Sequence, residues 1–67
     1  MGKFASNLEK IRTERKMTQE ELAKRVGVSQ PAIAQYENGS TVPRMNIAIK
    51  IAEVLQISIE SLITGKE

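Results

Sequence analysis

The feature that most constrains this chain is a connection of about three residues, residues 27–29, between two segments with helical patterns. Thr18 and Glu21 have the spacing of a capping box, which predicts that a helix begins there. Gly27 supplies a residue that can end this helix in a left-handed conformation, and Ser29 is a favourable cap for the next helix. Two short helices joined so tightly must cross steeply, so this stretch predicts a helix-turn-helix.

Apolar residues at helical spacing predict three further helices, which gives five in all. One spans about residues 3–15. Another begins at Pro43, placed in its first turn, and ends near residue 55, and the last runs from the cap Ser58 to about residue 64. The face of the 43–55 helix that we assign to the core comprises Met45, Ala48, Ile51, Ala52 and Leu55. No window shows sustained strand alternation, so we expect an all-α fold.

Composition excludes most other classes of protein. The chain has 67 residues, which suit one small domain, residues 1–67, without room for a catalytic cleft. It contains no Cys, His or Asp, so thiol nucleophiles, the usual general base and common soft-metal ligands are absent. We therefore expect no enzyme, no metal and no cofactor, and no small-molecule ligand is evident. No apolar run approaches the roughly 20 residues of a membrane span. We expect a cytoplasmic, nucleoid-associated protein with no membrane partner.

The charge distribution leaves two interpretations open. The net charge is +2 and the sequence pI is about 9.2, which favours polyanionic partners only mildly. Basic side chains concentrate near the N-terminal end, at Lys10, Arg12, Arg15, Lys16, Lys24 and Arg25. Glutamates are interleaved with them at Glu9, Glu14, Glu20 and Glu21. This pattern fits a surface for nucleic acid, and it fits a solvated helix face with salt bridges equally well.

The helix expected at residues 29–38 has an unusual outer face. At about 100° per residue, Gln30, Pro31, Ala34 and Gln35 fall within one arc. The opposite side holds Ala32, Ile33 and Tyr36. The outer arc carries no charge, whereas a face meant only for water would use Lys and Glu. Glutamine matches the edge of adenine, and small apolar groups fit a thymine methyl, so this arc resembles a base-reading surface. Uncharged helix surfaces without a partner also exist, and this helix alone does not decide.

Residues 8–63 closely resemble the Cro/C1-type helix-turn-helix family, also called the XRE family, which has the five-helix fold of lambda-type repressors. The family includes phage repressors and restriction-modification controllers. The matching positions are Thr18-Gln19-Glu20-Glu21-Leu22-Ala23, Gly27-Val28-Ser29, Ile33, Glu37-Asn38-Gly39, Pro43, Ile51-Ala52 and Leu55. The pattern joins positions over many helical turns, so the resemblance is specific.

The resemblance implies that residues 29–38 form a recognition helix in the major groove. Gln30 would read a base edge while braced by Gln19. The implied base-reading residues are Gln30, Pro31, Ala34 and Gln35. The implied phosphate contacts are Gln19, Ser29, Asn38, Ser40, Thr41 and Arg44. Pro31 departs from the family, because many members carry a polar base-reading side chain there, so we expect modest specificity and a preference for A·T pairs.

The resemblance also implies two structural features. Arg12 matches an arginine that commonly pairs with the glutamate closing the recognition helix, here Glu37, and we favour a structural role for this ion pair. After the core is assigned, the last two helices retain more apolar side chains than a small monomer normally exposes. Family members often pair through these helices, so we expect a homodimer. The interface candidates are Ile47, Val54, Ile59 and Ile63.

Together these observations predict a sequence-specific regulator of transcription, with repression favoured, that binds double-stranded DNA as a homodimer on a pseudo-palindromic operator. The alternative is a protein-interaction module, either an adaptor or an antitoxin, that keeps the helix-turn-helix fold. The sequence specifies neither the operator nor the regulated genes. It is also silent on whether residues 1–67 form a whole protein or the DNA-binding part of a longer repressor.

Overall fold

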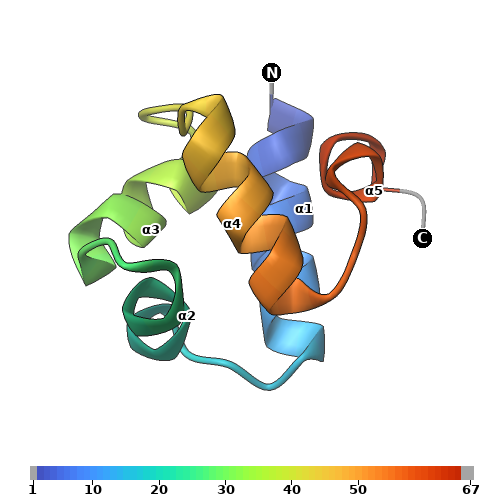
Figure 1. Cartoon of the computed structure of the whole chain (residues 1–67). Helices are drawn as coiled ribbons and strands as arrows, with labels where there is room; N and C mark the ends of the chain where they lie inside the picture. Colours follow the sequence, from blue (N-terminus) through green and yellow to red (C-terminus); the bar gives the residue numbers. More distant parts are fainter. Residues whose placement is uncertain (1, 66–67) are drawn as a thin grey trace.

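The computed structural model describes residues 2–65, and within them it contains five α helices and no strand. The helices are α1 (Gly2–Glu14), α2 (Gln19–Val26), α3 (Gln30–Asn38), α4 (Met45–Leu55) and α5 (Ile59–Thr64). Helices α2 and α3 lie on one side of the molecule, α5 lies on the opposite side, and α1 and α4 cross between them (Figure 1). The expected all-α fold is confirmed.

The junction between α2 and α3 forms through local hydrogen bonds. The backbone N–H of Glu21 donates to the Thr18 hydroxyl at 3.0 Å, and the Thr18 N–H donates to the Glu21 carboxylate at 2.9 Å. This second bond holds the pKa of the Glu21 carboxyl below its ordinary value. Gly27 has a φ of 91°, and its N–H donates to the Ala23 carbonyl at 2.8 Å. Ser29 caps α3 with its hydroxyl. The predicted capping box and glycine stop are both present.

A single core receives apolar side chains from all five helices. The largest fully buried side chains are Leu8, Leu22, Ile33, Ile51, Leu55 and Leu62. Ile33 is the residue that α3 places in this core, while the opposite side of α3 faces solvent. Packing therefore fixes which face of α3 is available to a partner.

Polar side chains of α1 and of the turn after it bind the carboxyl ends of two other helices. The Nε of Arg15 donates to the Leu55 carbonyl at the end of α4, at 3.1 Å. The Nδ2 of Asn7 donates to the carbonyls of Leu62 and Ile63 in α5, at 3.1 and 3.2 Å. These carbonyls lie in the last turns of their own helices, where no intrahelical partner remains. Asn7 of α1 satisfies those of α5, and Arg15, just after α1, satisfies that of α4.

The predicted start of α4 was wrong. Pro43 is buried and precedes the helix, Arg44 is its extended cap with a ψ of 159°, and Met45 is the first helical residue. The core assignment of Met45 was also wrong, because 63% of this residue is exposed. Met45 lies on the same stripe as Ala48 and Ile51, but one turn beyond the place where neighbouring helices cover that stripe.

Gln56, which follows α4, should be a site where a glycine stabilises the fold. Its φ is 61°, so its backbone adopts the left-handed conformation that a Cβ atom disfavours. The residue is exposed, so no burial of its side chain offsets this cost. Because left-handed backbone costs an L residue about 1–2 kcal/mol, partly offset by the larger chain entropy of glycine, Gln56→Gly should raise the free energy of unfolding by about 1 kcal/mol. Urea denaturation measures this. Gln56→Ala keeps the Cβ and serves as the control, and equal stability of the two variants would contradict the interpretation.

Candidate nucleic-acid interface

The outer face of α3 presents most of the predicted base-reading residues together. Gln30, Pro31 and Gln35 are exposed, and Ala34 is half-buried. The one charged side chain of α3, that of Glu37, is only 4% exposed and turns inward. The solvent-facing part of this helix is therefore polar or apolar but uncharged, and the amides of Gln30 and Gln35 are the hydrogen-bonding groups among the predicted base-reading residues.

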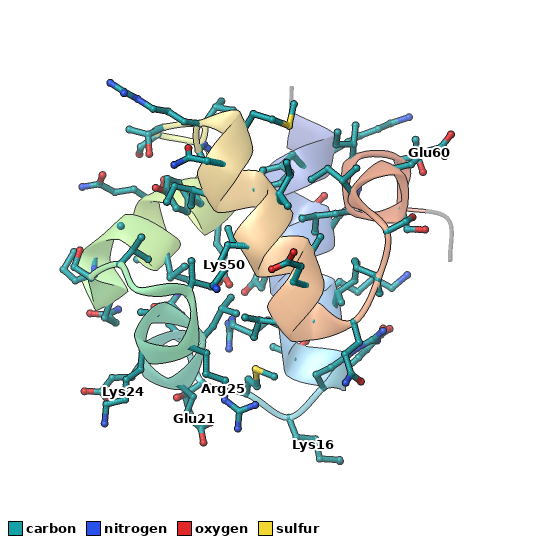
Figure 2. The ribbon with its side chains drawn as sticks, viewed as in Figure 1. Lys16, Glu21, Lys24, Arg25, Lys50 and Glu60 are labelled. Carbon is teal, nitrogen blue, oxygen red and sulfur yellow. The ribbon has the colours of Figure 1, made fainter. Side chains whose placement is uncertain are left out.

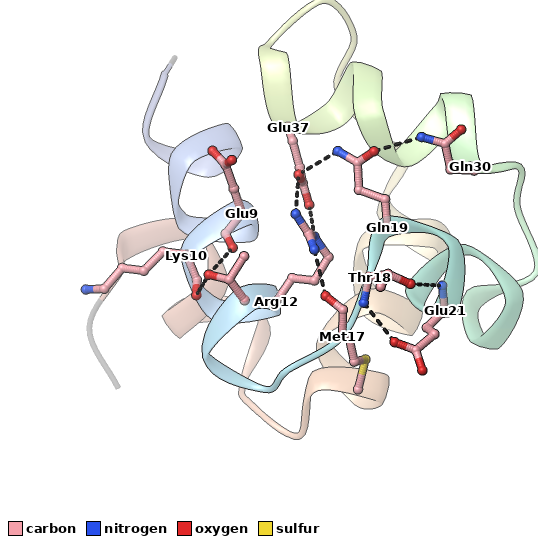
Figure 3. A network of polar contacts seen from close by, with 10 residues as sticks. Glu9, Lys10, Arg12, Met17, Thr18, Gln19, Glu21, Gln30 and Glu37 are labelled. Carbon is pink, nitrogen blue, oxygen red and sulfur yellow. Dashed lines mark hydrogen bonds and ion pairs between the residues drawn. The ribbon is translucent and has the colours of Figure 1, made fainter.

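Gln30 is joined to α1 through a continuous set of hydrogen bonds. Arg12 donates to both oxygens of Glu37, and its Nη1 also donates to the Met17 carbonyl at 2.6 Å. Glu37 Oε1 accepts from Gln19 Nε2 at 2.9 Å. Gln19 Oε1 in turn accepts from Gln30 Nε2 at 2.8 Å (Figure 3). We call these four residues, Arg12, Glu37, Gln19 and Gln30, the Arg12–Gln30 network.

The ion pair in this network is well shielded from water. The side chains of Arg12 and Glu37 are 11% and 4% exposed. The hydrogen bonding that Arg12 donates to Glu37 raises the pKa of Arg12, although burial acts in the opposite direction. Arg12 is thus held in its charged form, and the structure brings the predicted pair together. Because α1, α3 and the turn before α2 all contribute atoms, the pair fixes the position of the recognition helix candidate.

The predicted phosphate-contacting residues flank the outer face of α3. Gln19 and Ser29 lie at the amino-terminal starts of α2 and α3, where the Ser29 hydroxyl accepts from a backbone N–H of α3. At the other end, the Asn38 side chain accepts from the Ser40 N–H at 2.8 Å, which shapes the turn after α3. The remaining predicted contacts of this loop are exposed, namely Ser40, Thr41 and Arg44.

Charges of both signs are mixed on the surface around α2. Figure 2 shows Lys24, Arg25 and Glu21 extending from α2, and Lys16 from the turn before it. The interleaving of basic and acidic residues in the sequence is thus preserved in space. Within residues 2–65, no group of three or more His, Cys, Asp or Glu side chains is placed to hold a metal ion. None of the helices described there is long and apolar enough to cross a membrane.

The predicted dimer interface residues do not form one exposed surface. Ile47, Val54 and Ile59 are half-buried and pack against the domain's own core, and only Ile63 is well exposed, at 48%. The apolar residues that α4 and the preceding loop expose were not among the candidates. They are Val42, Met45 and Ile49.

An apolar hollow lies between the α3–α4 loop, the start of α1, the start of α4 and the end of α5. Its volume is about 700 Å³. The apolar side chains lining it include Phe4, Tyr36, Val42, Pro43, Met45 and Ile63. Val42 could have been noticed from the sequence, because it is an aliphatic residue in a short polar loop, but the hollow depends on contacts among distant segments.

Known proteins are similar to this chain in sequence and in fold. A helix-turn-helix family model matches residues 8–62. The chain is 36% identical to the uncharacterized HTH-type transcriptional regulator YqaE of Bacillus subtilis, over 94% of this chain and 54% of that protein. It is 31% identical to the cryptic phage CTXphi transcriptional repressor RstR of Vibrio cholerae, over 96% of this chain and 58% of that protein. The chain thus spans little more than half the length of these two relatives.

Among solved structures, the P22 c2 repressor in complex with a synthetic operator is similar. It matches with a TM-score of 0.88 and 32% identity, over 94% of this chain and 96% of that chain. The fold therefore defines a helix-turn-helix domain of the kind found in DNA-binding transcriptional regulators. The chain belongs to the Cro/C1-type, or XRE, helix-turn-helix family.

Loss of the ion pair should destabilise the domain strongly. Arg12→Met leaves the Glu37 carboxylate buried without its cationic partner, which should lower the free energy of unfolding by about 3–5 kcal/mol. Chemical denaturation measures this loss. Glu14→Gln is the matched control, because it removes only the exposed contact with Arg15 at 3.9 Å and should cost less than about 1 kcal/mol. Equal stability of the two variants would show that the buried pair does not hold the fold together.

Proposed function

We propose that this chain is a sequence-specific double-stranded DNA-binding regulator of transcription, with repression favoured and α3 as its recognition helix in the major groove. The observation that carries the proposal is the exposed, uncharged face of α3, on which the amide of Gln30 is held in place by a buried ion pair. A face that meets only water needs no such support. A side chain that must meet a base edge gains specificity from being held in one orientation.

Gln30 is the principal base-reading residue of the proposal. Its bond to Gln19 uses one hydrogen of Nε2, and this leaves Oε1 and the second N–H for a ligand. One acceptor beside one donor matches the N6 and N7 edge of adenine. Pro31 and the partly exposed Ala34 offer apolar contact to thymine methyl groups, and Gln35 offers a second amide. We therefore propose a preference for A·T pairs under this helix.

Contacts to phosphates would hold the helix in register. Gln19 keeps a second Nε2 hydrogen, and it lies at the start of α2, where free backbone N–H groups favour an anion. Ser29 lies at the start of α3, and Asn38, Ser40, Thr41 and Arg44 follow its other end. Contacts on both sides of the base-reading face would position α3 without specifying sequence. The P22 c2 repressor, solved with its synthetic operator, supports this arrangement by its similarity.

We also propose that the regulator binds a pseudo-palindromic operator as a homodimer, with half-sites about 34 Å apart. The domain measures 26 × 23 × 21 Å, which is less than the spacing between half-sites. For two copies to touch on DNA, we therefore place α3 on the side of each domain that lies away from the two-fold axis. The apolar hollow begins just after the carboxyl end of α3, at the loop that leads to α4. We place the contact there, through Val42, Met45 and Ile63. Ile47, Val54 and Ile59 pack against the core and do not line the hollow.

Gln30→Ala should weaken binding to the preferred duplex by about 1–3 kcal/mol and relax one base position, because a bidentate contact is lost. Selection from randomised duplexes, followed by affinity measurements, tests this. The phosphate contacts are untouched, so affinity should still fall steeply with salt. Gln56→Ala, an exposed glutamine beyond α4, is the control. Recovery of identical preferences at every position by Gln30→Ala would refute the role of Gln30.

The hollow also suits the second candidate function, a protein-interaction module that keeps this fold, because an apolar surface of this size can receive a partner's side chains. Such a module would bind its partner with little dependence on salt and would not discriminate among duplexes. The same selection and salt series therefore separate the two functions.

Ile63→Lys should prevent self-association without unfolding the domain, because Ile63 is exposed and lines the hollow. Sedimentation of the chain with its selected duplex should show two copies per site for the original protein and weaker, stepwise binding for the variant. Ile49→Lys, at another exposed apolar position outside the hollow, is the control. A dimer that survives Ile63→Lys and dissociates with Ile49→Lys would place the contact around Ile49, outside the hollow, instead.

A further inference from the structure

We propose that Glu37 determines base specificity at a distance, because its carboxylate fixes the orientation of two successive amides and so makes Gln30 prefer adenine to guanine. This inference rests on the proposed base-reading role of Gln30. Glu37 itself has a side chain that is only 4% exposed, so it acts as a positioning residue and does not touch the DNA.

The first step is the contact between Glu37 and Gln19. An ionised carboxylate can only accept hydrogen bonds, whereas an amide has a donating nitrogen and an accepting oxygen. Glu37 Oε1 accepts from Arg12 Nη2 at 3.1 Å and from Gln19 Nε2 at 2.9 Å. If the Gln19 amide were reversed, its oxygen would face a buried negative charge. The charge of Glu37 therefore decides that the nitrogen of Gln19 points toward it.

The second step carries this orientation to the surface. With its nitrogen toward Glu37, Gln19 turns its Oε1 outward, where it accepts from Gln30 Nε2 at 2.8 Å. Reversal of Gln30 would place two amide oxygens against each other. Gln30 therefore keeps its nitrogen inward, and Oε1 with one N–H remains for the base (Figure 3).

The Glu37 carboxylate, which sets the orientation of both amides, is itself held in place. Arg12 donates to both oxygens of Glu37 and to the Met17 carbonyl, so the carboxylate cannot rotate without breaking several charge-assisted bonds. Among the residues that the structure describes, no buried side-chain nitrogen or oxygen lacks a partner. The network therefore has no unsatisfied group whose pairing a reversed amide would improve.

The base preference follows from this polarity. Adenine presents an N–H donor at N6 and an acceptor at N7, which match the free oxygen and the free N–H of Gln30. Guanine presents acceptors at both O6 and N7, so the free oxygen of Gln30 meets another oxygen. A reversed Gln30 would present two N–H donors and would suit guanine instead.

The test is Glu37→Gln, which keeps the shape of the side chain and removes its charge. The new amide can donate to Gln19, so reversed amides become possible at Gln19 and Gln30. Competition between duplexes that differ only at the base under Gln30 should show a preference for adenine over guanine of about ten-fold or more in the original protein. In the variant this preference should fall below about three-fold, with the other positions unchanged.

Two further variants separate this role from a structural one. Glu53→Gln removes the same charge from an exposed site on α4, so it controls for the change in net charge and should keep the adenine preference. Gln19→Met interrupts the network while the Arg12–Glu37 pair remains, and it should also reduce discrimination against guanine, even if Glu37→Gln fails to fold. A merely structural role would weaken adenine and guanine duplexes equally.

The outcomes also distinguish this inference from the proposed function. If the original protein prefers adenine and Gln19→Met keeps that preference in full, the inference is overturned while base reading by Gln30 stands. If the original protein shows no preference at any position of any duplex, the proposed function itself is contradicted, and the inference that rests on it is contradicted with it.

Discussion

The buried pair between Arg12 and Glu37 is the interaction on which the rest of the structure depends. Two opposite charges are stable inside a small domain only when each is fully hydrogen-bonded. The guanidinium meets this condition with atoms of Glu37 and Met17, and the carboxylate with Arg12 and Gln19. These partners belong to α1, α3 and the start of α2. The requirement to satisfy one ion pair therefore sets the arrangement of three helices.

The same pair links the stability of the domain to its exposed surface. A core of aliphatic side chains can hold α3 in place, but it cannot determine how an exposed amide is turned, because apolar packing has no polarity. The ion pair supplies polarity, and the two glutamines carry it to the outer face of α3. On our proposal, a domain that is similar in structure to the operator-bound P22 c2 repressor thereby discriminates bases without a charge on the exposed face of α3.

Local signals in the sequence predicted the fold well. The Thr18–Glu21 box, the stop at Gly27 and the cap at Ser29 involve residues close in sequence, and the structure forms all three. The start of α4 was mispredicted because proline suits both a first helical turn and the residue before a cap, and burial of Pro43 selects the second.

The sequence was less informative about contacts between distant segments. The exposure of Met45 and the apolar hollow depend on how α5 and the start of α1 meet the α3–α4 loop. The orientation of the amides could not be predicted either, because the sequence does not specify which way a glutamine amide is turned. The family resemblance placed Gln19 beside Gln30, but it did not include the contact between Gln19 and Glu37 that orients both.

The most direct test of the central claim is a backbone-amide NMR titration with double-stranded oligonucleotides of varied sequence in dilute buffer. We predict that the largest shifts occur at the outer face of α3 and at the start of α2, with smaller shifts in the loop after α3. Signals that stay unmoved on α3, or shifts confined to the apolar hollow, would contradict the account.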